Sequence, residues 1–140
     1  MIRKRSARAL AGGLIVALLL ISASAAYAAV SGSFSGNTNQ KQSISMRVGG
    51  GHVTKLQFHV KDTCPSGHVY MIHDFNFPSI KINKFHKFDA KFVSTTTKAQ
   101  VEITGTVFKK QIKGKLAEVR FIKSEHHNCA GATRYTAHKQ

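Results

Sequence analysis

Acidic residues are scarce in this chain of 140 residues, which has six Asp and Glu against 21 Lys and Arg. A G-x-S-x-G motif is missing, and although His73 and Asp74 are neighbours, a catalytic triad is defined by geometry that this spacing does not supply. We therefore expect a protein that is not an enzyme, with no catalytic residue and no cofactor. The acidic residues also form no paired-carboxylate motif: they are Asp62, Asp74, Asp89, Glu102, Glu118 and Glu125.

Tryptophan is absent altogether, which argues against a sugar-binding module because the stacking platform of such modules usually includes Trp. Cysteine occurs only twice, at Cys64 and Cys129, and neither has a second Cys two residues away. This spacing excludes a Cys-x-x-Cys redox or zinc motif. In an oxidising compartment two such thiols most simply pair, so we predict one disulfide between Cys64 and Cys129.

The first 28 residues have the three parts of a secretory signal peptide. Four basic residues precede an apolar run at 14–21, and Ala26-Tyr27-Ala28 forms an A-x-A cleavage site. We predict cleavage after Ala28 and one mature domain, residues 29–140, that is secreted or held in the cell envelope. An uncleaved anchor over residues 9–30 is the alternative, since that segment is nearly long enough to span a bilayer.

The mature chain alternates apolar and polar residues with a period of two, and no useful length of it has a helical period. Leu56, Phe58 and Val60, for example, alternate with polar residues, as in a strand with one buried and one solvated face. Turn signals recur roughly every 8 to 12 residues. We predict an all-β fold, a single antiparallel β-sandwich of about eight or nine short strands, with a small β-barrel as the alternative.

Two matching pentads, residues 103–107 and 112–116, each have a glycine at the centre. If Lys109 and Lys110 form the tip of an antiparallel hairpin, Gly105 lies directly opposite Gly114. Two facing glycines leave a slot without side chains, and glycine within a strand often marks the close approach of another group. We expect a large side chain from the opposite sheet to fill this slot, with a ligand groove as the alternative.

The mature chain opens on a G-x-F-x-G-x-T-x-Q pattern at residues 32–40 and closes on Cys129-Ala130-Gly131 before an aromatic-x-Ala strand. With the Gly105/Gly114 hairpin, these features resemble a group of small secreted bacterial all-β proteins that has no assigned activity. The shared motifs are turn and packing residues, so the resemblance implies the fold and export rather than a function. Tyr135 stands where such sequences usually have Trp.

Positive charge is the strongest functional signal. Without the four basic residues of the leader, 17 Lys and Arg stand against six Asp and Glu, a net charge of +11. This exceeds the magnitude of about 2 to 8 that solubility alone calls for. We expect the partner to be an anionic polymer or surface of the cell envelope. The alternative is a structural or interaction domain whose charge only solvates it. Sequence-specific reading of nucleic acid is not expected, because only three arginines remain: Arg47, Arg120 and Arg134.

The densest basic and aromatic run lies between residues 81 and 92. Aromatic rings beside cations can hold single strands without sequence preference. The interpretation we favour is that Phe85, Phe88 and Phe92 are core and that the lysines are their solvated alternates. The residues predicted to bind a polyanion are the lysines of this run and of the hairpin tip: Lys81, Lys84, Lys87, Lys91, Lys109 and Lys110.

Histidine is abundant, with eight residues, and imidazole is a common ligand for zinc, copper and nickel. No fixed motif such as H-E-x-x-H occurs, so we expect scattered histidines and no metal site. A small metal-dependent enzyme is the third alternative, and its best candidate ligands are His73 with His126 or His127.

Overall fold

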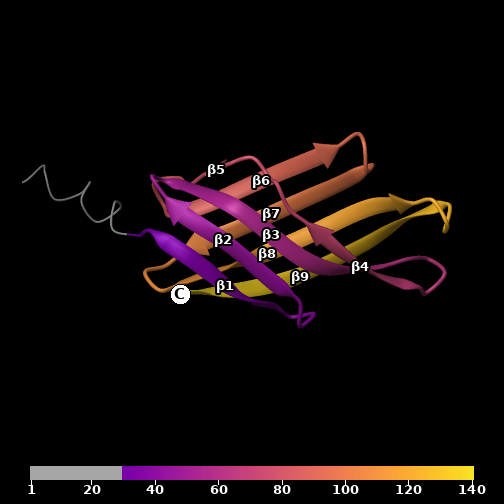
Figure 1. Ribbon diagram of the computed structural model, residues 1–140, viewed down its shortest axis with the longest axis horizontal. Helices are drawn as coiled ribbons and strands as arrows, with labels where there is room; N and C mark the ends of the chain where they lie inside the picture. Colours follow the sequence, from indigo (N-terminus) through magenta and orange to yellow (C-terminus); the bar gives the residue numbers. More distant parts are fainter. Residues whose placement is uncertain (1–29) are drawn as a thin grey trace, which may run out of the picture.

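The computed structural model describes residues 30–140; the predicted signal peptide, residues 1–28, lies outside the described residues. The predicted all-β antiparallel class is confirmed. Within residues 30–140 the chain has no helix that could cross a bilayer. The strands, shown in Figure 1, are β1 (Gly32–Thr38), β2 (Ser43–Gly49), β3 (His52–Thr63), β4 (Val69–Asp74), β5 (Ile80–Lys81), β6 (Lys87–Ser94), β7 (Ala99–Val107), β8 (Gln111–Ile122) and β9 (His127–Lys139).

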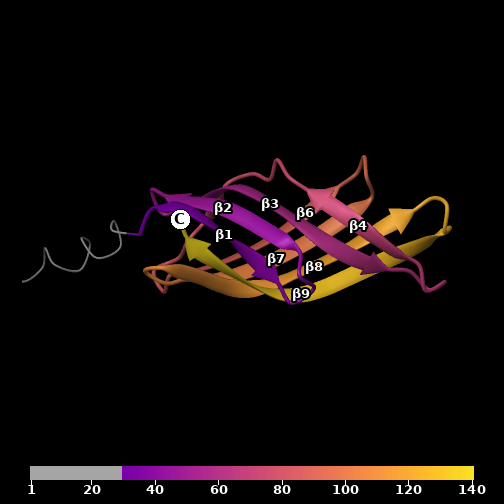
Figure 2. The ribbon, with the colours of Figure 1, turned by 60° about the horizontal axis from the view of Figure 1, so that its bottom comes forward.

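All these strands belong to one sheet with the order β4-β3-β2-β1-β9-β8-β7-β6, and β5 pairs with the start of β3. The part that contains β1, β2 and β3 lies over the part that contains β7, β8 and β9, so one continuous sheet supplies both layers of the predicted sandwich (Figures 1 and 2). At one side the two layers touch, where Thr63 of β3 pairs with Ala130 of β9. At the other side, among the residues described, β4 and β6 do not pair and the sheet stays open.

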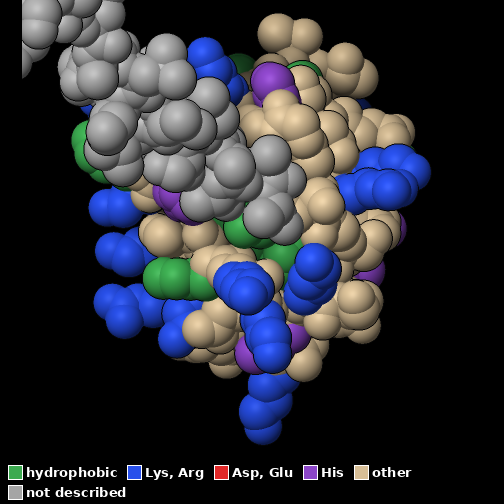
Figure 3. Space-filling model, turned by 90° about the vertical axis from the view of Figure 1, so that its left-hand side faces the viewer, with side chains coloured by type: hydrophobic (Ala, Val, Ile, Leu, Met, Phe, Trp, Pro, Cys, Tyr) green, Lys and Arg blue, Asp and Glu red, His purple; other side chains and the backbone are tan. Residues whose placement is uncertain are grey.

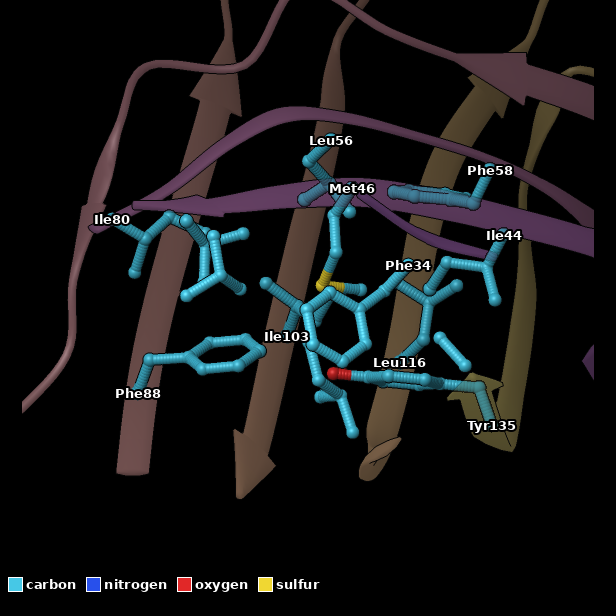
Figure 4. Close-up of a cluster of buried hydrophobic side chains, with 14 of the residues drawn as sticks. Phe34, Ile44, Met46, Leu56, Phe58, Ile80, Phe88, Ile103, Leu116 and Tyr135 are labelled. Carbon is cyan, nitrogen blue, oxygen red and sulfur yellow. The ribbon is translucent and has the colours of Figure 1, made fainter. Parts of the chain in front are cut away.

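The core lies between the two layers and follows the alternation of the sequence. Met46 of β2 and Phe58 of β3 point from one layer toward Ile103 and Leu116 of the other (Figure 4). All four side chains are at most 3% exposed. Burying such side chains is the main favourable contribution to folding, at about 1.5 to 3 kcal/mol for each.

The predicted hairpin register is confirmed: Gly105 pairs with Gly114. The prediction that a side chain from the opposite sheet fills the slot between these glycines is wrong. Phe88 of β6 pairs with Gly105, Tyr135 of β9 pairs with Gly114, and these two neighbours within the same layer cover the glycines. An aromatic side chain on an adjacent strand lies flat over a glycine more readily than a side chain reaches it from the opposite layer. The slot is therefore filled, and no ligand groove remains there.

The predicted disulfide between Cys64 and Cys129 is confirmed. Cys64 directly follows β3 and Cys129 lies in β9, beside the contact between Thr63 and Ala130. The bridge therefore fastens the two layers together at the point where they meet. Such a bond fits an extracellular protein, because thiols stay reduced in the cytosol.

Candidate functional site

Five of the six lysines predicted to bind a polyanion lie at one end of the folded sheet, where the β7–β8 turn, the start of β6 and the C-terminus meet (Figure 1). Backbone hydrogen bonds join these segments: the amide of Val107 donates to the carbonyl of His86, and the amide of Lys139 donates to the carbonyl of Lys110. We call this surface the basic end. Its lysines, all exposed, are Lys81, Lys84, Lys87, Lys109, Lys110 and Lys139.

Positive charge dominates the basic end. Figure 3 views the molecule from this side: Lys and Arg side chains surround the face, and no Asp or Glu side chain is visible among its described atoms. Within residues 30–140 none of these six lysines forms an ion pair with Asp or Glu, so their charges add up to a positive field at one end of the molecule. Four of the six acidic residues lie instead in the part of the molecule that carries the disulfide: Asp62, Asp74, Glu118 and Glu125.

Lys91 does not belong to the basic end. It lies farther along β6, and its Nζ is 3.3 Å from Oε1 of Glu102 on the paired strand β7. Both side chains are about half exposed, so the ion pair contributes little to stability. It does offset the charge of Lys91 locally. The predicted set therefore divides into five lysines that share a surface and one that does not.

The phenylalanines of the basic and aromatic run between residues 81 and 92 differ in burial. Phe88 is buried and Phe92 packs against the core, whereas Phe85 is 67% exposed, so its assignment to the core is wrong. The cause is local, because Oδ1 of Asn83 accepts hydrogen bonds from the amides of Phe85 and Lys87 and forms an Asx turn. This turn precedes β6 and directs Phe85 out of the sheet.

His73 lies on the outer face of the β3–β4 pair, where its ring stacks on that of His59 at 4.2 Å. Asp74, the next residue, directs its carboxylate inward to Arg120. Strand alternation thus separates the two neighbours, and they form no catalytic pair. Across residues 30–140, no three His, Cys, Asp or Glu side chains are grouped closely enough to hold a metal ion.

A group of charged side chains lies inside the fold, close to the disulfide, and the sequence analysis missed it. Nη2 of Arg120 donates to Oδ1 of Asp74 over 2.6 Å, and its Nε donates to Oε1 of Glu118 over 2.8 Å. Asp62 completes the group; its side chain is fully buried, and neither of its oxygens has a hydrogen-bond partner among the described residues. We call these four residues, Asp62, Asp74, Glu118 and Arg120, the carboxyl cluster.

The alternation of the strands contains the signal that could have predicted this cluster. Asp62 is in phase with Phe58 and Val60 on β3, and Glu118 is in phase with Leu116 on β8. Every second residue of a strand faces the same side, so both carboxyls fall on the buried face. A carboxylate motif is defined by spacing along the chain and not by strand phase, so no such motif joins Asp62 to Glu118.

Burial changes the protonation of the carboxyl cluster. Burial raises the pKa of Asp62 to about 7, although the nearby Arg120 lowers it. Burial also raises the pKa of Glu118, and the adjacent Asp74 carboxyl adds to the rise. One oxygen each of Asp74 and Glu118 accepts no hydrogen bond from the described residues. With a pKa of about 7, Asp62 changes its protonation state near neutral pH.

Two members of the carboxyl cluster, Asp74 and Arg120, line a cavity of about 670 Å³ between the free edges β4 and β6. Phe77 and Phe92, with ring centroids 4.9 Å apart, form part of its apolar wall. The carboxyl of Glu118 is buried and does not line the cavity. Of the carboxyl cluster, a molecule in the cavity would thus meet only Asp74 and Arg120, which already pair with each other. The other polar side chains of the lining include His73, Lys91 and Thr96.

Glu125, in the β8–β9 turn, accepts three hydrogen bonds from the segment after the disulfide. Ser66 Oγ lies 2.6 Å from its carboxylate, His68 Nδ1 2.6 Å and Tyr70 Oη 2.9 Å. These bonds, that of Ser66 foremost, lower the pKa of Glu125 to about 2. Ser, His and Glu are the residue types of a triad, but the Ser66 hydroxyl donates to the carboxylate rather than to the imidazole, so no base activates it. The contact instead joins two turns.

Comparison with known proteins adds no relative: no family model, no curated protein and no solved structure matches this chain.

Proposed function

We propose that the domain of residues 29–140 is a non-enzymatic binding domain that holds an anionic polymer or surface of the cell envelope at the basic end. The observation that supports this most is the separation of charge. Six exposed lysines gather at the basic end, and Figure 3 shows no Asp or Glu side chain among the described atoms of this side, while four of the six acidic side chains lie around the disulfide. Lysine suits such a partner, since a flexible ammonium group contacts phosphate or sulfate as a point charge.

The competing explanation is that the charge only keeps the domain in solution. Solvating lysines alternate outward along strands and need no common location. At the basic end the lysines come instead from three separate segments: the β5–β6 region, the β7–β8 turn and the end of β9. This convergence favours a binding surface, and it also identifies which lysines to remove.

Two features support a role outside the cytosol. The disulfide between Cys64 and Cys129 fits an oxidising compartment, and the predicted signal peptide supplies a route of export. The partner is then an anionic component that an exported protein meets, such as a polyphosphate or an acidic polysaccharide of the envelope.

Retention on heparin at increasing salt tests the proposal. We expect the parent protein to elute above about 0.2 M salt, because binding through many ionic contacts has a steep salt dependence. The variant K84Q/K109Q/K110Q removes three charges from the basic end and should elute at clearly lower salt. The matched control K98Q/K115Q/K123Q removes three exposed lysines elsewhere, so both variants have the same net charge.

The informative result is the difference between the two variants in the salt concentration of elution, because both have the same total charge. A large shift for the first variant alone supports a located surface. Equal shifts would refute it and leave only a general attraction of a basic protein for an acidic matrix. Elution of the parent below about 0.2 M would favour charge that only solvates the domain.

A further inference from the structure

Two phenylalanines protrude at the basic end. Phe85 is 67% exposed in the turn before β6, and Phe108 is 46% exposed in the β7–β8 turn. Both border one hollow of about 550 Å³, to which Val30 and Val107 also contribute apolar surface. Exposed phenylalanine costs free energy in water, and the acidic polysaccharides and polyphosphates considered above offer nothing apolar to cover it.

Lysines surround these two rings. Nζ of Lys84 is 5.2 Å from the centroid of Phe85, and Lys109 and Lys110 directly follow Phe108. The basic end thus combines apolar side chains at the tips of two turns with cations beside them. This is the combination that the interface of an anionic bilayer accepts: rings enter the boundary between head groups and acyl chains, while ammonium groups reach the phosphates.

We propose that the basic end docks on the surface of an anionic lipid bilayer, with Phe85 and Phe108 inserted at the level of the head groups. This inference rests on the proposed function, since the lysines supply the attraction to negative charge, and it identifies the anionic partner as lipid. A single-stranded nucleic acid also pairs rings with cations, but it needs rings arranged along a groove. Here the rings lie on two separate turns around one hollow.

Vesicle sedimentation with the exported protein tests this inference. We expect binding to vesicles of phosphatidylcholine with about one-third phosphatidylglycerol and none to phosphatidylcholine alone, because the lysines require anionic lipid. The variant F85S/F108S should bind the anionic vesicles at least about tenfold more weakly, because it removes the inserted apolar surface. Both side chains are exposed, so the thermal melt of the variant should match that of the parent.

A matched control removes exposed apolar surface elsewhere. Phe75 and Val93, at 57% and 68% exposed, lie near the open edges of the sheet and away from the basic end. The variant F75S/V93S should bind anionic vesicles like the parent. Heparin retention of F85S/F108S should also be unchanged, because its lysines remain in place.

The heparin and vesicle results together separate the two proposals. Retention on heparin without binding to anionic vesicles overturns the lipid inference and leaves the proposed function standing. Vesicle binding that F85S/F108S does not weaken overturns the insertion of the rings. Binding to oligothymidylate that depends on Phe85 and Phe108, with no vesicle binding, would identify a single strand instead. Failure on both heparin and vesicles would overturn both proposals.

Discussion

Gly105 lies directly opposite Gly114 in the β7–β8 ladder, and the hydroxyl of Tyr135 is 2.7 Å from the position that a Cβ would take on either glycine. The same hydroxyl donates a hydrogen bond of 2.9 Å to the carbonyl of Thr104. Burial raises the pKa of Tyr135 above its ordinary value, so the hydroxyl keeps the proton that it donates. The two glycines therefore make room for a buried phenol and its hydrogen bond.

Replacing Gly114 by Val should destabilise the fold by about 1 to 3 kcal/mol, because the new side chain meets both the Tyr135 ring and the backbone carbonyl of Thr104. Thermal or urea unfolding measures the loss. The control is Thr104→Val, one position along from Gly105 on the exposed face of β7, which should be near neutral. Equal tolerance of the two substitutions would contradict the assignment of faces on this hairpin.

The strands and the hairpin register could be predicted from the sequence because both depend on local patterns. Alternation places Phe58 and Val60 on the buried face, and the paired pentads fix Gly105 against Gly114. Which side chain covers the glycines could not be predicted, since that depends on which strands become neighbours. β9 lies beside β8 in the sheet, and this brings Tyr135 onto Gly114.

The candidate site could be predicted only in part, because it too depends on which segments of the chain become neighbours. Five of the six lysines of the basic end are predicted from the sequence and Lys139 is not, because the common location of these lysines depends on segments that meet in space. Phe85 was misassigned because the Asx turn at Asn83 interrupts the alternation just before β6. Asp62 and Glu118 are 56 positions apart in the numbering, so only the packing of the two layers brings them together.

Removing the bridge between Cys64 and Cys129 should destabilise the domain by about 2 to 5 kcal/mol, as for native bridges in small secreted domains. The physical reason is that the bridge joins residues 65 positions apart and so restricts the unfolded chain. Urea unfolding of C64S/C129S against the parent measures the loss. Labelling of the unfolded, unreduced protein, produced in an oxidising compartment, should detect no free thiol; two labelled thiols would contradict the bridge.

Glu125 should stabilise the fold at neutral pH and lose this effect in acid. Hydrogen bonds from Ser66, His68 and Tyr70 lower its pKa from 4.5 to about 2, so its contribution is present above pH 4.5 and is lost as the pH falls toward 2. The variant E125Q should be less stable than the parent at pH 7 and should lose less stability between pH 5 and pH 2. An unchanged acid limb in the urea unfolding of E125Q would exclude this role.

The carboxyl cluster should make the domain more stable at pH 5 than at pH 8. The pKa of Asp62 is raised from 3.8 to about 7 by burial, so between these values the folded protein holds a proton that the unfolded chain has released. Stability is then complete below about pH 4 and falls as the pH rises through 7. For a fully buried group the fall is on the order of 3 kcal/mol, at about 1.4 kcal/mol per pH unit.

Asp62→Asn tests the predicted fall in stability between pH 5 and pH 8, because asparagine keeps the size of the side chain and cannot ionise. The variant should lose much of the decline in unfolding free energy between pH 5 and pH 8, and at pH 8 it should be more stable than the parent. Asp89→Asn is the matched control, since Asp89 is exposed on β6 and the change in formal charge is the same. All other titratable groups are common to the parent and D62N, so the difference between the two proteins isolates Asp62. A D62N variant with the same slope as the parent would show that Asp62 is ionised in the folded state.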